Sequence, residues 1–145
     1  MESSLHILLY RAFHAQRNYL RPSLQALGLG TGQPKLLAYL EANGPCHQRQ
    51  LADYFDVDPA TISRMMESLQ AGGFISRRTD EQNHRRDLVQ VTDRGRQASA
   101  EWRAHCRQAQ EIMLQGFTHQ ERAQFADYLA RAYGNMQEEL GRKAP

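Results

Sequence analysis

The sequence predicts a mainly α fold with a small antiparallel β-hairpin wing, that is, a winged helix-turn-helix flanked by dimerisation helices. Three features between Gln48 and Thr92 lead to this prediction. Two short segments with helical periodicity are separated by a tight turn, and a strong helix-start signal opens the second. After Gly72-Gly73 the pattern becomes strand-like around an arginine-rich loop. Helix, turn, helix and basic hairpin in this order are typical of a module that reads DNA.

Two helices are expected before this stretch. An apolar stripe at helical spacing predicts the first from Ser4 to Leu20. Pro22 predicts a break at or near Arg21, with a kink as the alternative, because proline disfavours a helical residue before it. The apolar patch at 24–29 predicts one further helical turn. The next helix is expected to open at 31 and to have its body at 33–42, and the sequence Asn-Gly-Pro at 43–45 ends it.

The second helix of the central stretch is expected to read DNA. The first is expected at 48–55, above a scaffold formed by the preceding helix, and the second starts with Asp58 as N-cap and Pro59 at the first helical position. One face is apolar, and the other is small or polar apart from one arginine, so it can approach a major-groove floor. An ordinary helix with a solvated outer face is the alternative, and the neighbouring hairpin favours DNA reading. The expected contacts are Pro59, Ala60, Thr61, Ser63, Arg64 and Ser68.

The hairpin is expected to run over 74–78, turn over 80–86 and return along 88–91. Arg85, near its apex, is predicted to enter a minor groove, because a rigidly held guanidinium suits the negative potential concentrated there. The other arginines are expected to hold phosphates, which position the module without reading sequence. The basic residues proposed as wing contacts are Arg77, Arg78, His84, Arg85 and Arg86.

Two stretches resemble the MarR family of transcriptional regulators. QLADYFDVDPATISRMMESLQAGGFI is similar to the family's helix-turn-helix, and AGGFISRRTDEQNHRRDLVQVTDRG is similar to its wing and following helix start. Asn83 stands where the family usually has an aspartate that holds the wing arginine by a salt bridge, and asparagine supplies no such charge. The resemblance implies a homodimer on double-stranded DNA, and a crevice for a small aromatic or drug-like effector between the dimerising helices and each reading module.

The remaining sequence predicts two long helices. Thr92 is expected to cap one that runs to about 115, where Gly116 ends it, and Thr118 with Glu121 has capping-box spacing for a second that runs to about 140. The tail at 141–145 is expected to fray. The stripes on the first and last helices exceed what one module needs, so a second copy is expected to cover them. Two-fold symmetry would then place two reading helices about 34 Å apart.

Length, charge and motifs bound the remaining possibilities. The 145 residues suit one domain, with a reading lobe at 32–96 and a dimerisation region at 1–30 and 97–145. A net charge of +2 is too mild to prove a nucleic-acid partner, although sixteen of the eighteen basic residues are arginine. No membrane-spanning run or basic leader is evident, so a cytoplasmic protein without a membrane partner is expected. Known catalytic motifs are absent, so no enzyme and no cofactor are expected.

Control by a small ligand is the expected mode of regulation, with His14, Arg17 and Tyr39 as a candidate carboxylate-binding cluster. The function predicted is a ligand-responsive repressor that covers a palindromic operator as a homodimer. Ligand binding would favour one separation of the two reading helices, and only the matched separation fits both half-sites. A winged-helix protein that uses its wing for protein contacts, and binds DNA only non-specifically, is the alternative of a different class.

Cysteine or metal sensing remains a variant of the same regulator. Cys46 lies beside His47 and Arg49, and Cys106 lies near two arginines, so both thiols are candidates for a lowered pKa. His105 and Cys106 are the strongest metal-ligand pair, but adjacent helical residues point about 100° apart, so no metal site is predicted.

Overall fold

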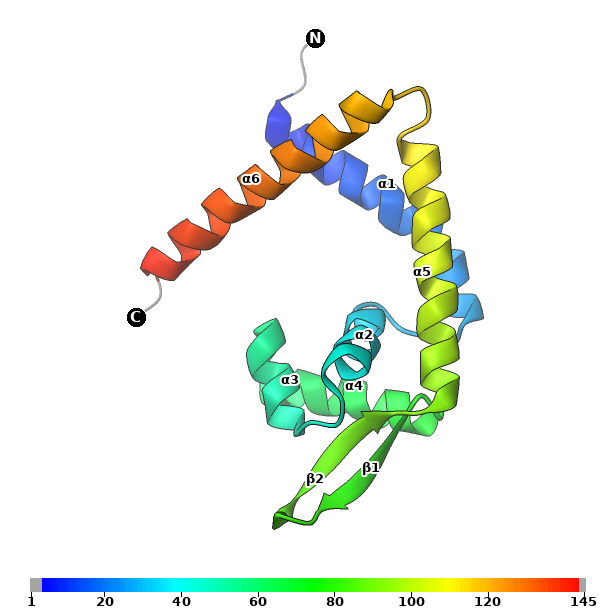
Figure 1. Cartoon of the computed structure of the whole chain (residues 1–145), viewed down its shortest axis with the longest axis vertical. Coiled ribbons are helices and arrows are strands. Elements are labelled where there is room, and N and C mark those ends of the chain that lie inside the picture. Colours follow the sequence, from blue (N-terminus) through cyan, green and yellow to red (C-terminus); the bar gives the residue numbers. More distant parts are fainter. Residues whose placement is uncertain (1–3, 144–145) are drawn as a thin grey trace. The chain divides into compact units, whose positions relative to one another are not determined.

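The computed structural model describes residues 4–143, which form six helices and one antiparallel hairpin, as the sequence predicts (Figure 1). The described chain divides between Ala109 and Gln110 into two compact units. None of the described helices is long and apolar enough to cross a membrane. In chain order the elements are α1 (Leu5–Ala26), α2 (Gln33–Asn43), α3 (Gln48–Phe55), α4 (Pro59–Ala71), β1 (Ile75–Asp80), β2 (Asn83–Val91), α5 (Asp93–Met113) and α6 (His119–Lys143).

One hydrophobic core joins α2, α3 and α4 to the base of the hairpin. Burying these side chains is the main stabilising contribution, because each large aliphatic group removed from water contributes about 1.5–3 kcal/mol. The core also fixes the outward face of α4, since the side chains on its opposite face are immobilised here. The largest fully buried side chains are Leu36, Leu37, Leu40, Leu51, Ile62, Met66, Leu69 and Val89.

The first helix is longer than predicted. α1 is continuous through Pro22, so the prediction of a break near Arg21 is wrong. Proline costs an interior helix one hydrogen bond and crowds the preceding turn. Here Leu20 is buried and Leu24 packs against the core, so apolar contacts on both sides of the proline hold the segment helical. The predicted helical turn at 24–29 is therefore partly the last turn of α1.

The hairpin is longer, and its turn tighter, than predicted. The turn is made by Glu81 and Gln82, not by the whole segment 80–86. Thr79 pairs with Asp87 while Asp80 pairs with Asn83, so the three residues at 84–86 form a bulge in β2 opposite no partner. At its base the hairpin is extended by one bridge, in which Cys46 and Val89 exchange two backbone hydrogen bonds of 3.1 and 2.8 Å.

Local capping explains the starts of the two long helices. The Thr92 hydroxyl accepts a hydrogen bond from the Gly95 N–H at 3.1 Å, which begins α5 as predicted. At the start of α6, Thr118 and Glu121 exchange side-chain to backbone bonds of 2.9 and 3.1 Å, the predicted capping box. The predicted fraying of 141–145 is wrong for residues 141–143, which are helical, and 144–145 lie outside the described residues.

Large apolar side chains on α1 and on α6 are exposed within one chain. Leu5 is 81% exposed and Met136 is 61% exposed, whereas comparable core leucines are fully buried. No described side chain of α6 is buried. Each helix thus carries an apolar stripe that its own unit leaves uncovered. The α1 stripe comprises Leu5, Leu8, Leu9 and Phe13, and the α6 stripe comprises Phe125, Leu129, Tyr133 and Met136.

Candidate nucleic-acid interface

The start of α4 is organised by a short chain of hydrogen bonds. Asp58 accepts bonds from the Thr61 N–H at 3.0 Å and from the Thr61 hydroxyl at 2.6 Å. These bonds hold the pKa of Asp58 below its usual range, and the Arg64 guanidinium adds to the effect. Arg64 in turn donates from Nη2 to the Thr61 hydroxyl at 3.1 Å. The predicted cap is confirmed, and it also anchors the arginine expected to contact DNA.

The outer face of α4 is open to solvent because the opposite face is fixed in the core. Pro59, Ala60, Arg64 and Ser68 are exposed, while Thr61 and Ser63 are half-buried. Small side chains around one long cation let the helix backbone approach a groove closely while the cation reaches base edges or phosphates. The face proposed from the sequence is therefore present as a surface.

Arg77 has a different environment from the other wing arginines. Its Nε donates to Gln70 Oε1 at 3.0 Å, and its Nη2 donates to Gln48 Oε1 at 2.9 Å. Gln70 belongs to α4 and Gln48 begins α3, so this guanidinium joins the wing to both helices. The sequence suggested a phosphate contact here, whereas the structure gives Arg77 two internal partners. Helical and strand periodicity carry no signal for such a connection.

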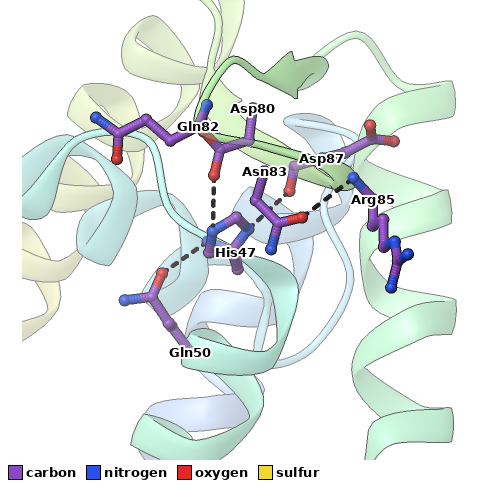
Figure 2. A network of polar contacts seen from close by, with 7 residues as sticks. All are labelled: His47, Gln50, Asp80, Gln82, Asn83, Arg85 and Asp87. Carbon is purple, nitrogen blue, oxygen red and sulfur yellow. Dashed lines mark hydrogen bonds and ion pairs between the residues drawn. The ribbon is translucent and has the colours of Figure 1, made fainter.

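His47 makes a second connection between the wing and α3 (Figure 2). Its ring Nδ1 lies 3.2 Å from the carbonyl oxygen of Asp87, and its Nε2 lies 3.2 Å from Oδ2 of Asp80. The His47 backbone N–H donates to Gln50 Oε1 at 2.7 Å. The sequence was informative about His47 only as a neighbour of Cys46, so its contact with the wing was missed.

Near the hairpin tip, Asn83 positions a backbone group. Its Oδ1 accepts a hydrogen bond from the Arg85 N–H at 3.2 Å. The Arg85 side chain points away from the His47 contacts (Figure 2). Arg85 lies in the β2 bulge, close to the turn at the tip of the hairpin. The asparagine thus holds the main chain at this arginine, and no ion pair recorded among residues 4–143 involves its guanidinium.

The exposed cations of this region form a set that we call the basic surface. His84 accompanies four arginines, and all five are exposed. Within the described chain, none of these arginines takes part in an ion pair. A guanidinium without an acidic partner remains available to phosphates. The basic surface comprises Arg64, Arg78, His84, Arg85 and Arg86.

A mainly apolar cavity of about 380 Å³ lies among α1, the loop before α2, and α5. Of the predicted ligand-binding cluster, only Arg17 lines it. His14 stacks on Tyr10, with ring centroids 5.7 Å apart. Tyr39 packs against Tyr54, with ring centroids 4.7 Å apart. The structure therefore does not bring the three predicted residues into one site. Trp102 also lines the cavity, whereas periodicity indicates only that it belongs to an apolar stripe. The residues lining the cavity include Arg17, Leu20, Arg21, Trp102 and Cys106.

The two cysteines do not have the environment expected of a low-pKa thiol. Cys46 is buried at the hairpin base, and burial raises its pKa. Cys106 is half-buried beside the cavity, and burial also raises its pKa. The expected lowering by neighbouring cations is therefore wrong for both thiols. Among residues 4–143, no group of three or more His, Cys, Asp or Glu side chains could hold a metal ion.

Comparison with known proteins agrees with this geometry. The sequence model described as "MarR family" matches residues 27–87. The HTH-type transcriptional regulator YybA of Bacillus subtilis is 30% identical over 111 residues, which cover 77% of this chain and 74% of YybA. YxaD of the same organism is 31% identical over 96 residues, covering 66% of this chain and 67% of YxaD.

Solved structures lead to the same family. The crystal structure of MarR superposes with a TM-score of 0.81 at 27% identity, covering 97% of this chain and 96% of that chain. A MarR-family regulator from Silicibacter pomeroyi gives a TM-score of 0.67 at 33% identity, covering 88% and 86% of the respective chains. This family and this fold are those of transcription regulators, which are not enzymes. The chain belongs to the MarR family of DNA-binding, winged helix-turn-helix transcriptional regulators.

Proposed function

We propose that this regulator is a repressor that binds a palindromic operator as a homodimer and responds to a small effector. The observation that carries the DNA contact is the basic surface, whose arginines are exposed and have no ion pair within the described chain. Together with the small outer face of α4, it offers one element for a major groove and another for phosphates and a minor groove. Repression follows if the bound dimer covers a promoter.

The DNA contact is tested with Arg85→Ala and a matched control, Arg107→Ala, at an exposed position of α5. The probe is a duplex that the protein itself selects from a random-sequence pool. Loss of a specific groove contact should weaken binding by about 1–3 kcal/mol, whereas the control should bind as wild type. Equal affinity of both variants in a gel-shift titration at fixed salt would reject the role of Arg85.

The dimer is supported by the uncovered apolar stripes of α1 and α6. Covering such stripes with the same helices of a second copy would remove them from water. Deleting residues 1–20, or introducing Leu129→Glu, should convert the dimer into a monomer measured by light scattering. Tyr54→Glu is the control, because Tyr54 is a 68% exposed residue of α3 that belongs to neither stripe. A deletion variant that stays dimeric would contradict this arrangement.

The cavity supports a response to an effector. Its walls are mainly apolar, and two arginines, Arg17 and Arg21, are among the residues that line it, a combination that suits a small aromatic acid. Trp102 lines the cavity and is the single tryptophan of the chain, so its fluorescence reports directly on occupancy. Saturable quenching by a panel of aromatic carboxylates should weaken in Arg17→Ala and persist in Arg107→Ala. An unchanged titration in Arg17→Ala would remove this residue from the site.

The alternative, in which the wing contacts proteins and DNA binding is non-specific, makes a different prediction for the same assays. Phosphate contacts make both kinds of complex weaken as salt rises, but only a specific complex should discriminate among duplex sequences. A chain of this alternative class would select no preferred sequence from the pool.

A further inference from the structure

The ring of His47 contacts two groups that can only accept hydrogen bonds. Nδ1 faces the Asp87 carbonyl oxygen, and Nε2 faces the Asp80 carboxylate, each at 3.2 Å (Figure 2). A neutral imidazole has one N–H, so one of these contacts would bring two lone pairs together. The imidazolium has two N–H groups and satisfies both. The geometry therefore matches the protonated ring.

The ring is not needed to begin α3. The Gln50 side chain accepts the His47 backbone N–H at 2.7 Å, and the Gln50 backbone N–H donates to the His47 carbonyl at 3.0 Å. These bonds use only main-chain atoms of His47. Its imidazole is thereby left to connect the helix-turn-helix to the wing, and a substitution at the ring can spare the helix start.

The two acceptors lie on either side of the wing tip. Asp80 is the last residue of β1, and Asp87 follows the bulge that contains Arg85 and Arg86. Asp80 also accepts the Gln82 N–H at 2.9 Å, which fixes the turn. One ring therefore holds both strands at the base of the segment that carries part of the basic surface.

Other charged groups surround the His47 ring. Two hollows flank His47, one between α3 and β2 and one between α3 and the wing tip. The ion pair with Asp80 is partly shielded, since the two side chains are 23% and 15% exposed. The acidic and basic side chains that line these hollows are Asp80, Glu81, Asp87, Arg49, Arg77, Arg78 and Arg86.

We propose that His47 is a positioning residue. When its ring is protonated, its contacts with Asp80 and with the Asp87 carbonyl, which we call the clasp, together hold α3 to the wing and strengthen DNA binding on the acid side of neutrality. The proposal rests on the proposed DNA-binding function. Histidine ordinarily changes charge between about pH 5 and 8. The imidazolium can donate to both acceptors, whereas the neutral ring can donate to only one of them, so the neutral form loosens one of the two contacts. The wing bulge is then held less firmly against its groove.

The test measures affinity for the selected duplex between pH 6 and 8 at fixed ionic strength. Wild-type affinity should rise as the pH falls from 8 to 6. The share of this increase that is due to the clasp should be roughly two- to fivefold, as expected for a partly shielded ion pair. His47→Gln and Asp80→Asn should both lose that part. Asparagine at 80 can still accept the Gln82 N–H, so the turn is retained.

His84 is the necessary control, because it is exposed on the basic surface and could meet phosphate directly when protonated. In the His84→Gln background, replacing His47 with glutamine should still remove the same part of the pH dependence of affinity. A His47→Gln variant with the full pH dependence of wild type would overturn the proposal, as would a wild type whose affinity does not change with pH.

A second measurement needs no DNA. The free energy of unfolding in urea is compared at pH 6 and 8 for wild type, His47→Gln, Asp80→Asn and the double variant. The coupling between the two sites should be present at pH 6 and diminished at pH 8. If no duplex is selected but this coupling appears, the DNA-binding proposal fails while the clasp stands. Binding without the coupling contradicts the clasp alone.

Discussion

Replacing Arg77 with alanine should lower stability without removing a phosphate contact. The guanidinium donates to Gln70 on α4 and to Gln48 on α3, at 3.0 and 2.9 Å. A hydrogen bond from a charged donor contributes about 1.5–3 kcal/mol, and one of these two bonds is exposed. After a discount for that exposure, we expect Arg77→Ala to reduce the free energy of unfolding by about 1–3 kcal/mol.

The assay pairs this variant with its neighbour. Arg78 is exposed and belongs to the basic surface, so Arg78→Ala should change stability by less than about 0.5 kcal/mol. Each phosphate contact that is lost reduces the slope of log affinity against log salt by about 0.9. Arg78→Ala should show this reduction, while Arg77→Ala should keep the wild-type slope. Urea unfolding and DNA titrations over a salt series measure the two quantities.

The opposite pattern would refute the reasoning. Suppose that Arg77→Ala has the wild-type free energy of unfolding but a salt slope reduced by the amount expected for one phosphate contact. The arginine is then a DNA contact, and its two hydrogen bonds to glutamine contribute little to stability. Gln48→Ala tests the coupling between the two side chains. It should lower the free energy of unfolding less in the Arg77→Ala background than in wild type. Additive effects would show that the two side chains are not coupled.

Two further predictions concern the core and the thiols. Gly95→Ala should destabilise the fold by about 3 kcal/mol or more in urea unfolding, since a Cβ there would lie 2.1 Å from the Phe74 carbonyl oxygen and 2.7 Å from a Val91 methyl group. Wild-type stability would mean that this backbone approach relaxes easily. Because burial raises the pKa of Cys46, less thiolate is present at neutral pH than for an exposed cysteine, and alkylation should accelerate only in more alkaline solution. Rapid labelling of Cys46 at pH 7, followed by mass spectrometry against a Cys46→Ser control, would contradict this.

Features specified by neighbouring residues could be predicted from the sequence. Asp58 and Thr118 begin their helices because each side chain bonds a backbone group three residues later. The same local character explains why the outer face of α4 could be proposed before any tertiary contact was known. Periodicity, turn signals and capping residues predicted the order of the elements. The expectation of a dimer came partly from the surplus apolar stripes and partly from the resemblance to a family.

Features that depend on distant residues were missed or misplaced. The helix continues through Pro22 because Leu20 is buried and Leu24 packs against the core, a tertiary effect that outweighs a local preference. His47 contacts the carbonyl of a residue 40 positions away, and no local pattern predicts this. Cys46 has cationic neighbours in sequence, but its burial against β2 determines its pKa instead.

The bulge in β2 separates the length of the wing tip from the alignment of the strands below it. Pairing resumes at Thr79 and Asp87 whatever lies in the extra segment, so residues there can vary without shifting the strand positions nearer the core. Insertions or exchanges at 84–86 should therefore be tolerated by the scaffold while altering what touches the duplex. Substitutions in this short segment can therefore change operator preference without changing how the chain folds.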